Sequence, residues 1–132
     1  MRDAAIDWNE VWKKESAKRS VKKRDVTFWN EKARNFFKKP WESNYSEDFL
    51  KIMRPRRCWT VLDMGCGTGA LTIPLSRYVR RITAVDFSPR MLEGLEEQCR
   101  AQSIENVRTI KASWEDDWSS RDIGEYDVVI AS

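Results

Sequence analysis

The chain has 132 residues, 41% of them hydrophobic, and a formal net charge of +3, which suits about one globular domain. No apolar run approaches the ~18 residues that a membrane span needs, and the N-terminus lacks the apolar segment of a secretory signal, so we expect no membrane partner. Histidine is absent, which excludes imidazole metal sites and histidine-based catalytic triads. Three cysteines, Cys58, Cys66 and Cys99, form no Cys-x-x-Cys pair, so we expect reduced thiols in a cytoplasmic protein and no metal site.

Charge divides unevenly along the chain. Residues 1–60 hold 16 Lys and Arg against 9 Asp and Glu, whereas residues 61–132 hold 8 against 12. Such a basic N-terminal lobe permits an RNA partner without requiring one. Solvated helix faces are the other explanation, and the more common one.

The N-terminal segment is predicted to be helical. Trp8, Val11 and Trp12 recur at helical spacing within a first helix over residues 1–24. A second helix is predicted from about Thr27 until Pro40. Its apolar face consists of Trp29, Ala33, Phe36 and Phe37.

A third helix follows a loop over residues 41–45. Ser46 is its predicted N-cap, with acidic residues in the first turn, and Pro55 ends it. The tryptophans of this half are expected to be packing residues: Trp8, Trp12, Trp29 and Trp41.

From residue 58 the pattern changes to alternating strands and helices. Strands are predicted at residues 59–64, 82–86, 107–112 and 126–131. Helices are predicted between the first three strands, at about 70–80 and 89–102. Ser88 before Pro89 is an N-cap followed by proline at the first helical position, whereas Pro74 must delay or kink the earlier helix. Residues 113–124 are a polar linker with at most one short turn. Strand–helix–strand units of this length indicate a parallel sheet with right-handed crossovers.

Residues 60–75, TVLDMGCGTGALTIPL, place a buried strand, a glycine-rich turn and a helix start in succession. Gly65, Gly67 and Gly69 permit positive φ and let a ligand approach the backbone closely. In this context the motif predicts a nucleotide-type site at the carboxyl end of the first strand.

Three segments resemble the class I (Rossmann-like) S-adenosylmethionine-dependent methyltransferases. VLDMGCGTGAL is similar to their cofactor-binding signature, AVDFSPRML to the segment after it, and YDVVIAS to their fourth strand. The resemblance covers roughly residues 28–132. It implies an α/β fold: an incomplete doubly wound, Rossmann-like parallel sheet of about four strands, preceded by an N-terminal helical extension or lid. Residues 1–57 would be that extension and 58–132 the first half of the cofactor-binding domain, truncated after the fourth strand.

The resemblance also implies which residues bind S-adenosylmethionine. The turn from Gly65 to Gly69, including Cys66 and Thr68, would bring backbone amides against its methionine end. Asp63 would repel a pyrophosphate but suits the ammonium and sulfonium charges of this cofactor. Asp86 closes the second strand, where a carboxylate can accept from both ribose hydroxyls, and Phe87 offers an apolar face to the adenine.

For two further parts of the cofactor site, the sequence allows more than one interpretation. Ser113 stands where the superfamily commonly has an acid that accepts from the adenine amino group, so the backbone of Trp114 and the side chain of Glu115 are the candidate substitutes. Trp114 either covers the adenine or packs in the linker. Tyr45 and Phe37 either close over the methionine moiety or pack between helices.

No catalytic residue can be named, because methyl transfer needs mainly positioning and a dry pocket. The predicted activity is methyl transfer to an unidentified acceptor, with a small molecule favoured over RNA or protein. The truncated chain could lack this activity. The apolar edge of its fourth strand, residues 126–131, predicts a homodimer or higher assembly.

Two other functions compete with methyl transfer. Gly65, Gly67 and Ala70 satisfy the Gly-x-Gly-x-x-Gly/Ala pattern of NAD- and FAD-dependent oxidoreductases, although Asp63 would face the phosphates. A non-catalytic fragment that binds ligand weakly or only assembles with a partner is the third hypothesis.

Overall fold

The structure, a computed structural model, describes residues 7–18, 24–36 and 44–131. Three helices come first: α1 (Trp8–Lys18), α2 (Val26–Phe36) and α3 (Tyr45–Met53). Strands and helices then alternate: β1 (Thr60–Met64), α4 (Thr72–Leu75), β2 (Arg81–Asp86), α5 (Pro89–Ala101), β3 (Val107–Lys111), a 3₁₀ turn at Trp118–Ser120, and β4 (Val128–Ala131). Within these described residues no helix is long and apolar enough to cross a membrane.

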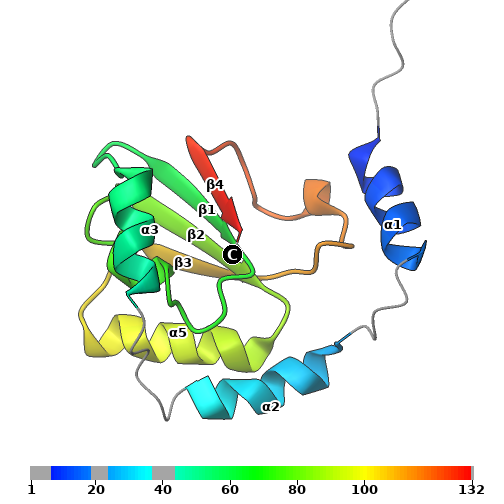
Figure 1. The fold of residues 1–132 in the computed structure, drawn as a ribbon, viewed down its shortest axis with the longest axis horizontal. Coiled ribbons are helices and arrows are strands. Elements are labelled where there is room, and N and C mark those ends of the chain that lie inside the picture. The colour runs from blue at the N-terminus through cyan, green and yellow to red at the C-terminus, as the bar shows by residue number, and fades with distance from the viewer. Residues whose placement is uncertain (1–6, 19–23, 37–43, 132) are drawn as a thin grey trace, which may run out of the picture.

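The four strands form one parallel sheet in the order β3-β2-β1-β4, as Figure 1 shows. The chain thus moves outward from β1 through β2 to β3 and then returns to the other side of β1. The connections that follow neighbouring strands therefore run to opposite sides of the sheet and leave a crevice at the carboxyl ends of the central strands. Open α/β sheets bind ligands in such a crevice. The predicted α/β, Rossmann-like sheet is confirmed.

Hydrophobic residues fill both faces of this sheet. On one face, Val61 of β1 and Ile82 of β2 pack with Leu71 and Leu75, and α3 lies against the same cluster. The helix α5 covers Ala84 through Leu92 and Leu95. On the opposite face Leu62, Met64 and Val85 pack under the linker after β3. Near-continuous apolar strands are typical of a parallel sheet that is buried on both sides.

Several predicted helix boundaries were wrong. Of the first helix predicted over residues 1–24, the structure has α1 over Trp8–Lys18, and Asp7 and Arg24 are not helical. Residues 1–6 and 19–23 lie outside the described residues. The third helix begins at Tyr45, with Asn44 at the cap position and no side-chain capping bond, so Ser46 is not its N-cap. The helix predicted over residues 70–80 is reduced to the four residues of α4. Phe37 and Trp41 lie outside the described residues.

Other local predictions are confirmed. The side chain of Ser88 accepts a hydrogen bond from the Met91 N–H (3.2 Å), and Pro89 occupies the first position of α5. The polar linker after β3 contains only the short 3₁₀ turn. At Gly69, with φ +97°, a Cβ atom would lie 2.5 Å from Leu95 Cδ1 and 2.9 Å from Ile73 Cγ1. Only glycine therefore lets the turn pack so closely against α5.

Candidate cofactor site

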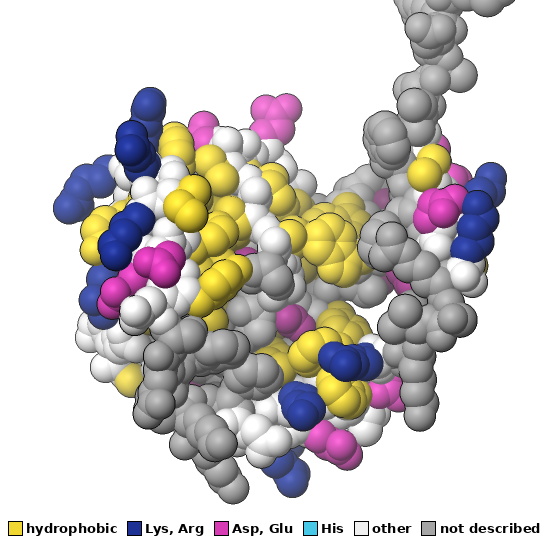
Figure 2. Space-filling view, in the orientation of Figure 1, with side chains coloured by type: hydrophobic (Ala, Val, Ile, Leu, Met, Phe, Trp, Pro, Cys, Tyr) yellow, Lys and Arg dark blue, Asp and Glu magenta, His cyan; other side chains and the backbone are white. Residues whose placement is uncertain are grey.

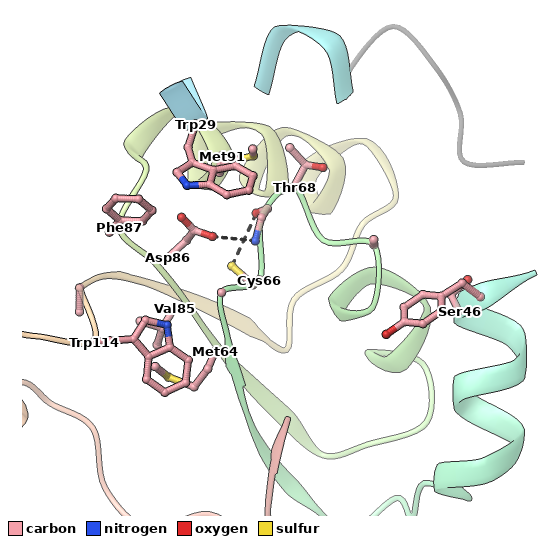
Figure 3. A pocket seen from close by; sticks show the side chains of 15 residues that line it. Trp29, Ser46, Met64, Cys66, Thr68, Val85, Asp86, Phe87, Met91 and Trp114 are labelled. Atoms are coloured by element: carbon pink, nitrogen blue, oxygen red, sulfur yellow. Dashed lines mark hydrogen bonds between the residues drawn. The ribbon is translucent and has the colours of Figure 1, made fainter. Parts of the chain in front are cut away.

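A cavity of about 580 Å³ opens at the carboxyl ends of β1 and β2. Figure 3 shows the side chains that line it, drawn from the glycine-rich turn, the end of β2, α2, α3 and the start of the linker. Of the residues expected to bind a cofactor, the lining includes Tyr45, Gly65, Cys66, Gly67, Thr68, Asp86, Phe87 and Trp114. Asp63, Gly69, Ser113 and Glu115 do not line it.

Asp86 joins the glycine-rich turn to the start of α5. Its Oδ2 accepts a hydrogen bond from the Gly67 N–H (2.9 Å), and its Oδ1 accepts one from the Ser88 N–H (2.9 Å). A carboxylate has about four lone-pair positions, so two remain for hydroxyl donors from the cavity. The side chain is 9% exposed. Asp86 is therefore fixed in place and can still accept from a ligand.

The glycine-rich turn is held by β2 and is open toward the cavity. The N–H groups of Gly65 and Cys66 both donate to the Val85 carbonyl, at 2.8 and 3.0 Å. Gly65 has φ +70° and Gly67 φ +57°, and a Cβ at Gly65 would meet nothing within 4 Å. Left-handed backbone with open space beside it lets a ligand lie directly against the peptide groups.

Asp63 lies buried at the end of β1, beneath the turn, with 1% of its surface exposed. Its Oδ2 accepts from the Thr72 hydroxyl (2.6 Å), whereas Oδ1 is buried without a hydrogen-bond partner. Burial raises the pKa of Asp63 to about 6; the Thr72 hydrogen bond opposes this rise and the negative charge of Asp86 adds to it. Neither carboxylate forms an ion pair with a described Lys or Arg. Among the described residues, no Lys or Arg therefore neutralises the negative charge of these two carboxylates through an ion pair.

Apolar side chains form the walls of the cavity. Figure 3 shows Trp29 and Phe87 above Asp86, with Met91 beside them. Trp114, Val85 and Met64 lie together on the other side. Trp29 was expected to be a packing residue, and that prediction was wrong. The signal that could have found it is Phe28-Trp29, which precedes the first strand within the stretch that resembles the methyltransferases.

The helix α2, which carries Trp29, is tied to the site by one hydrogen bond. The Ser88 hydroxyl donates to Asn30 Oδ1 at 2.6 Å. Ser88 is the residue whose N–H binds Asp86. Ser88 thus connects the helix that carries Trp29 to the carboxylate of Asp86, through its hydroxyl on one side and its backbone N–H on the other.

The third-strand end does not supply the expected polar contact. Ser113 is engaged in its own turn, where its N–H donates to Asp116 Oδ2 (3.0 Å) and its carbonyl accepts from Trp118 Nε1 (3.0 Å). Glu115 is exposed and is not part of the lining. Trp114 lines the cavity although half of its surface is exposed. The aromatic face, rather than the acid, is what this segment offers to a ligand.

Cys66 is a buried member of the lining. Burial, with the negative charges of Asp63 and Asp86, raises the pKa of its thiol, so it is not a nucleophile at neutral pH. Together the residues form an apolar slot that has the Asp86 carboxylate and bare peptide groups at one end, with Asp63 buried behind the turn. Such a site can bind a ligand that carries hydroxyls, a positive charge and a flat apolar ring.

Comparison with known proteins identifies a methyltransferase family. Residues 61–132 match the family model described as "Methyltransferase domain". An uncharacterised protein of Haemophilus influenzae is 33% identical over 108 residues, covering 79% of this chain and 39% of the relative. The ubiquinone/menaquinone biosynthesis C-methyltransferase UbiE of Zymomonas mobilis is 35% identical over 63 residues, covering 48% of this chain and 26% of that protein. Ribosomal RNA small subunit methyltransferases A also match, over 73 residues for the probable enzyme of Methanosphaera stadtmanae and over 50 for that of Desulforapulum autotrophicum.

Solved structures share the fold. Coclaurine N-methyltransferase bound to N-methylheliamine and S-adenosylhomocysteine superposes with a TM-score of 0.55 at 19% identity, covering 95% of this chain and 48% of that one. The chain thus spans less than half the length of these relatives.

Proposed function

We propose that this chain, which belongs to the methyltransferase domain family, holds S-adenosylmethionine in the cavity beside β1 and β2 as part of an enzyme that methylates a small molecule. The observation that carries the proposal is Asp86, a carboxylate hydrogen-bonded to the Gly67 N–H and aimed at the same cavity as the turn. Acceptors held by hydrogen bonds in this way are suited to the two adjacent hydroxyls of a ribose. Charge-assisted bonds of this kind contribute roughly 1.5–3 kcal/mol each.

Asp63 supports a cationic ligand. A buried oxygen without a partner costs on the order of 1–3 kcal/mol in the free protein, and an approaching positive charge offsets that cost. With Asp86 nearby, Asp63 makes the end of β1 negative, which disfavours a pyrophosphate and suits an ammonium or sulfonium group. The residues present therefore fit S-adenosylmethionine.

The protein's part in the reaction is to bind, orient and exclude water. S-adenosylmethionine supplies a methyl group on a sulfonium centre, which is already activated toward an attacking nucleophile. Trp29, Phe87 and Met91 present an apolar wall that removes water from the slot. Positioning and a dry pocket supply most of the acceleration in such a transfer. No side chain in the described lining is placed as a general base.

A nicotinamide- or flavin-dependent oxidoreductase is the competing function. It predicts that NAD⁺ binds and S-adenosylmethionine does not. We would measure thermal unfolding of the chain with S-adenosylmethionine, S-adenosylhomocysteine and NAD⁺ separately, since a ligand that binds the native state raises its melting temperature. We expect a rise with the first two only, and a rise with NAD⁺ alone would refute the proposal.

The matched variants for this test are Asp86→Asn and Asp122→Asn. Asp86→Asn removes a carboxylate of the cavity and should abolish most of the thermal rise. Asp122 is exposed and pairs with Arg108, far from the lining, so Asp122→Asn should respond to the ligands as the parent does. A methylation assay with candidate acceptors would then separate a catalytic chain from a fragment that only binds.

We also propose that the chain self-associates through β4. This strand pairs with β1 alone within the described sheet, and Val129 is 60% exposed on it. Unpaired apolar strands recruit other strands. Light scattering after size-exclusion chromatography should give a dimer or larger species, and a Val129→Lys variant should be shifted toward monomer. A monodisperse monomer for the parent chain would refute this.

A further inference from the structure

Six arginines gather at the end of the sheet that lies opposite the cavity. Three come from the loop between α3 and β1, two from the turn between α4 and β2, and one is the first residue of β2: Arg54, Arg56, Arg57, Arg77, Arg80 and Arg81. We call these residues the arginine edge. All six are exposed. Figure 2 shows one gathering of Lys and Arg on the side of the molecule where α3 lies.

The backbone holds the two loops together. The Trp59 carbonyl accepts from the N–H groups of Arg80 (2.9 Å) and Arg81 (3.4 Å), which fixes one loop against the other. The Asn106 side-chain amide donates to the carbonyls of Ser76 (2.8 Å) and Val79 (3.2 Å), and these two hydrogen bonds fix the turn between α4 and β2. The arginines are therefore displayed on a fixed scaffold at the N-terminal ends of the strands.

Few of these guanidinium groups are engaged with other side chains of the fold. Among the described residues none of the six forms an ion pair. Arg77 donates to Gln102 and Arg56 lies over the Trp59 ring (5.9 Å). Carboxylates in neighbouring turns are fewer: Glu105, Glu125 and Asp127. Asp127 accepts from the N–H and hydroxyl of Thr60, so its charge is already engaged. The surface is net positive.

Aromatic side chains lie between the guanidinium groups. Tyr78, between Arg77 and Arg80 in sequence, is 48% exposed, and Trp59 is half-buried beside Arg56. Guanidinium groups bind phosphates in a bidentate manner, and exposed aromatic rings stack on unpaired bases. The rings alone do not separate a phospholipid surface from nucleic acid, because Tyr and Trp also lie at lipid headgroups. Six guanidinium groups on one fixed scaffold match a chain of closely spaced phosphates with bases between them. The combination favours single-stranded nucleic acid.

We propose that the arginine edge binds single-stranded nucleic acid through its phosphates and bases, at a surface separate from the cofactor cavity. The five residues of β1 separate the two surfaces by about 17 Å at 3.3–3.4 Å per residue. The arginine edge is therefore an anchoring surface rather than part of the reaction site. The proposal does not depend on which ligand fills the cavity.

Fluorescence anisotropy with a labelled single-stranded RNA of about 12 nucleotides tests this. Four phosphate contacts predict a loss of about fifty-fold in affinity between 50 and 200 mM salt. The charge-reversed variant Arg57→Glu/Arg80→Glu should lose more than tenfold in affinity at fixed salt. Both side chains are exposed, and the milder Arg57→Gln/Arg80→Gln variant gives the same direction if the reversal impairs folding.

The matched control is Lys13→Glu/Lys14→Glu, which makes the same charge change on exposed positions of α1. It should leave RNA affinity within about twofold of the parent. Tyr78→Ala should weaken RNA binding severalfold and leave heparin binding unchanged, since heparin has no bases to stack. Equal losses in the two charge-reversed variants would overturn the proposal. So would binding to phosphatidylserine vesicles without binding to RNA.

Discussion

Replacing Asp63 by Asn should change how the stability of the chain depends on pH. The pKa of Asp63 is raised from its ordinary value of 3.8 to about 6 because the carboxylate is buried. The folded state therefore holds a proton that the unfolded state has released between about pH 4 and 6. The contribution of Asp63 to the free energy of unfolding is highest below about pH 4, falls as the pH rises from about 4 to 6, and is constant above about pH 6.

The size of the effect follows from the same shift. Two pKa units correspond to about 3 kcal/mol, at about 1.4 kcal/mol per unit. Asn at position 63 cannot ionise and can still accept from the Thr72 hydroxyl. The stability of Asp63→Asn relative to the parent should therefore rise by up to about 3 kcal/mol between pH 4 and pH 7. Any fixed cost of the new amide is the same at both pH values and cancels.

Urea denaturation at several pH values, followed by tryptophan fluorescence, measures this difference. Asp122→Asn, in an exposed pair, should show a change of less than about 1 kcal/mol over the same range. A relative stability of Asp63→Asn that stays flat or falls between pH 4 and 7 would refute the reasoning. Such a result would mean that the ionised form of Asp63 is not destabilised by burial in the free protein.

Three further changes test the turn, the α2 wall and the thiols. Gly69→Ala should lower the free energy of unfolding by about 3 kcal/mol, because its methyl group would collide with Leu95 of α5. Gly65→Ala, where the added Cβ meets open space, should cost about 1–2 kcal/mol of backbone strain and mainly weaken cofactor binding. Urea denaturation measures the loss of stability and calorimetric titration the loss of cofactor affinity. Asn30→Ala should lower S-adenosylhomocysteine affinity severalfold with a stability loss below about 1.5 kcal/mol, and Asn30→Asp, which keeps an acceptor for Ser88, should restore most of it. A thiol reagent should label Cys58, the one exposed cysteine, within the time that leaves the two buried thiols unreacted, and simultaneous labelling would contradict the fold.

The parts of the fold that depend on local chemistry could be predicted from the sequence. The N-cap at Ser88 and the strand–turn–helix around Gly65 are encoded by residues within a few positions of one another. The parallel sheet follows from apolar strands joined by connections long enough to cross from the end of one strand to the start of the next. The adjacency of Asp86 and the Gly67 N–H then follows from the pairing of β1 with β2.

What could not be predicted depends on contacts across the chain. The helix expected over residues 70–80 stops at Leu75, because the carbonyls of Ser76 and Val79 are satisfied by the Asn106 side chain, 30 and 27 positions away. No local pattern reveals that partner. Trp29 has the spacing of a packing residue, and it faces the cavity because α2 packs against α5 and Asn30 accepts from Ser88. The arginine edge is likewise formed by two loops that the sequence does not place together.

A crystal structure of the chain with S-adenosylhomocysteine would test most directly whether the carboxylates and the glycine-rich turn form a cofactor site. We expect ligand density in the cavity, with the ribose hydroxyls at Asp86 and the adenine against the apolar walls of Phe87 and Trp114. Ligand bound at another surface, with the cavity filled only by solvent under saturating conditions, would contradict it.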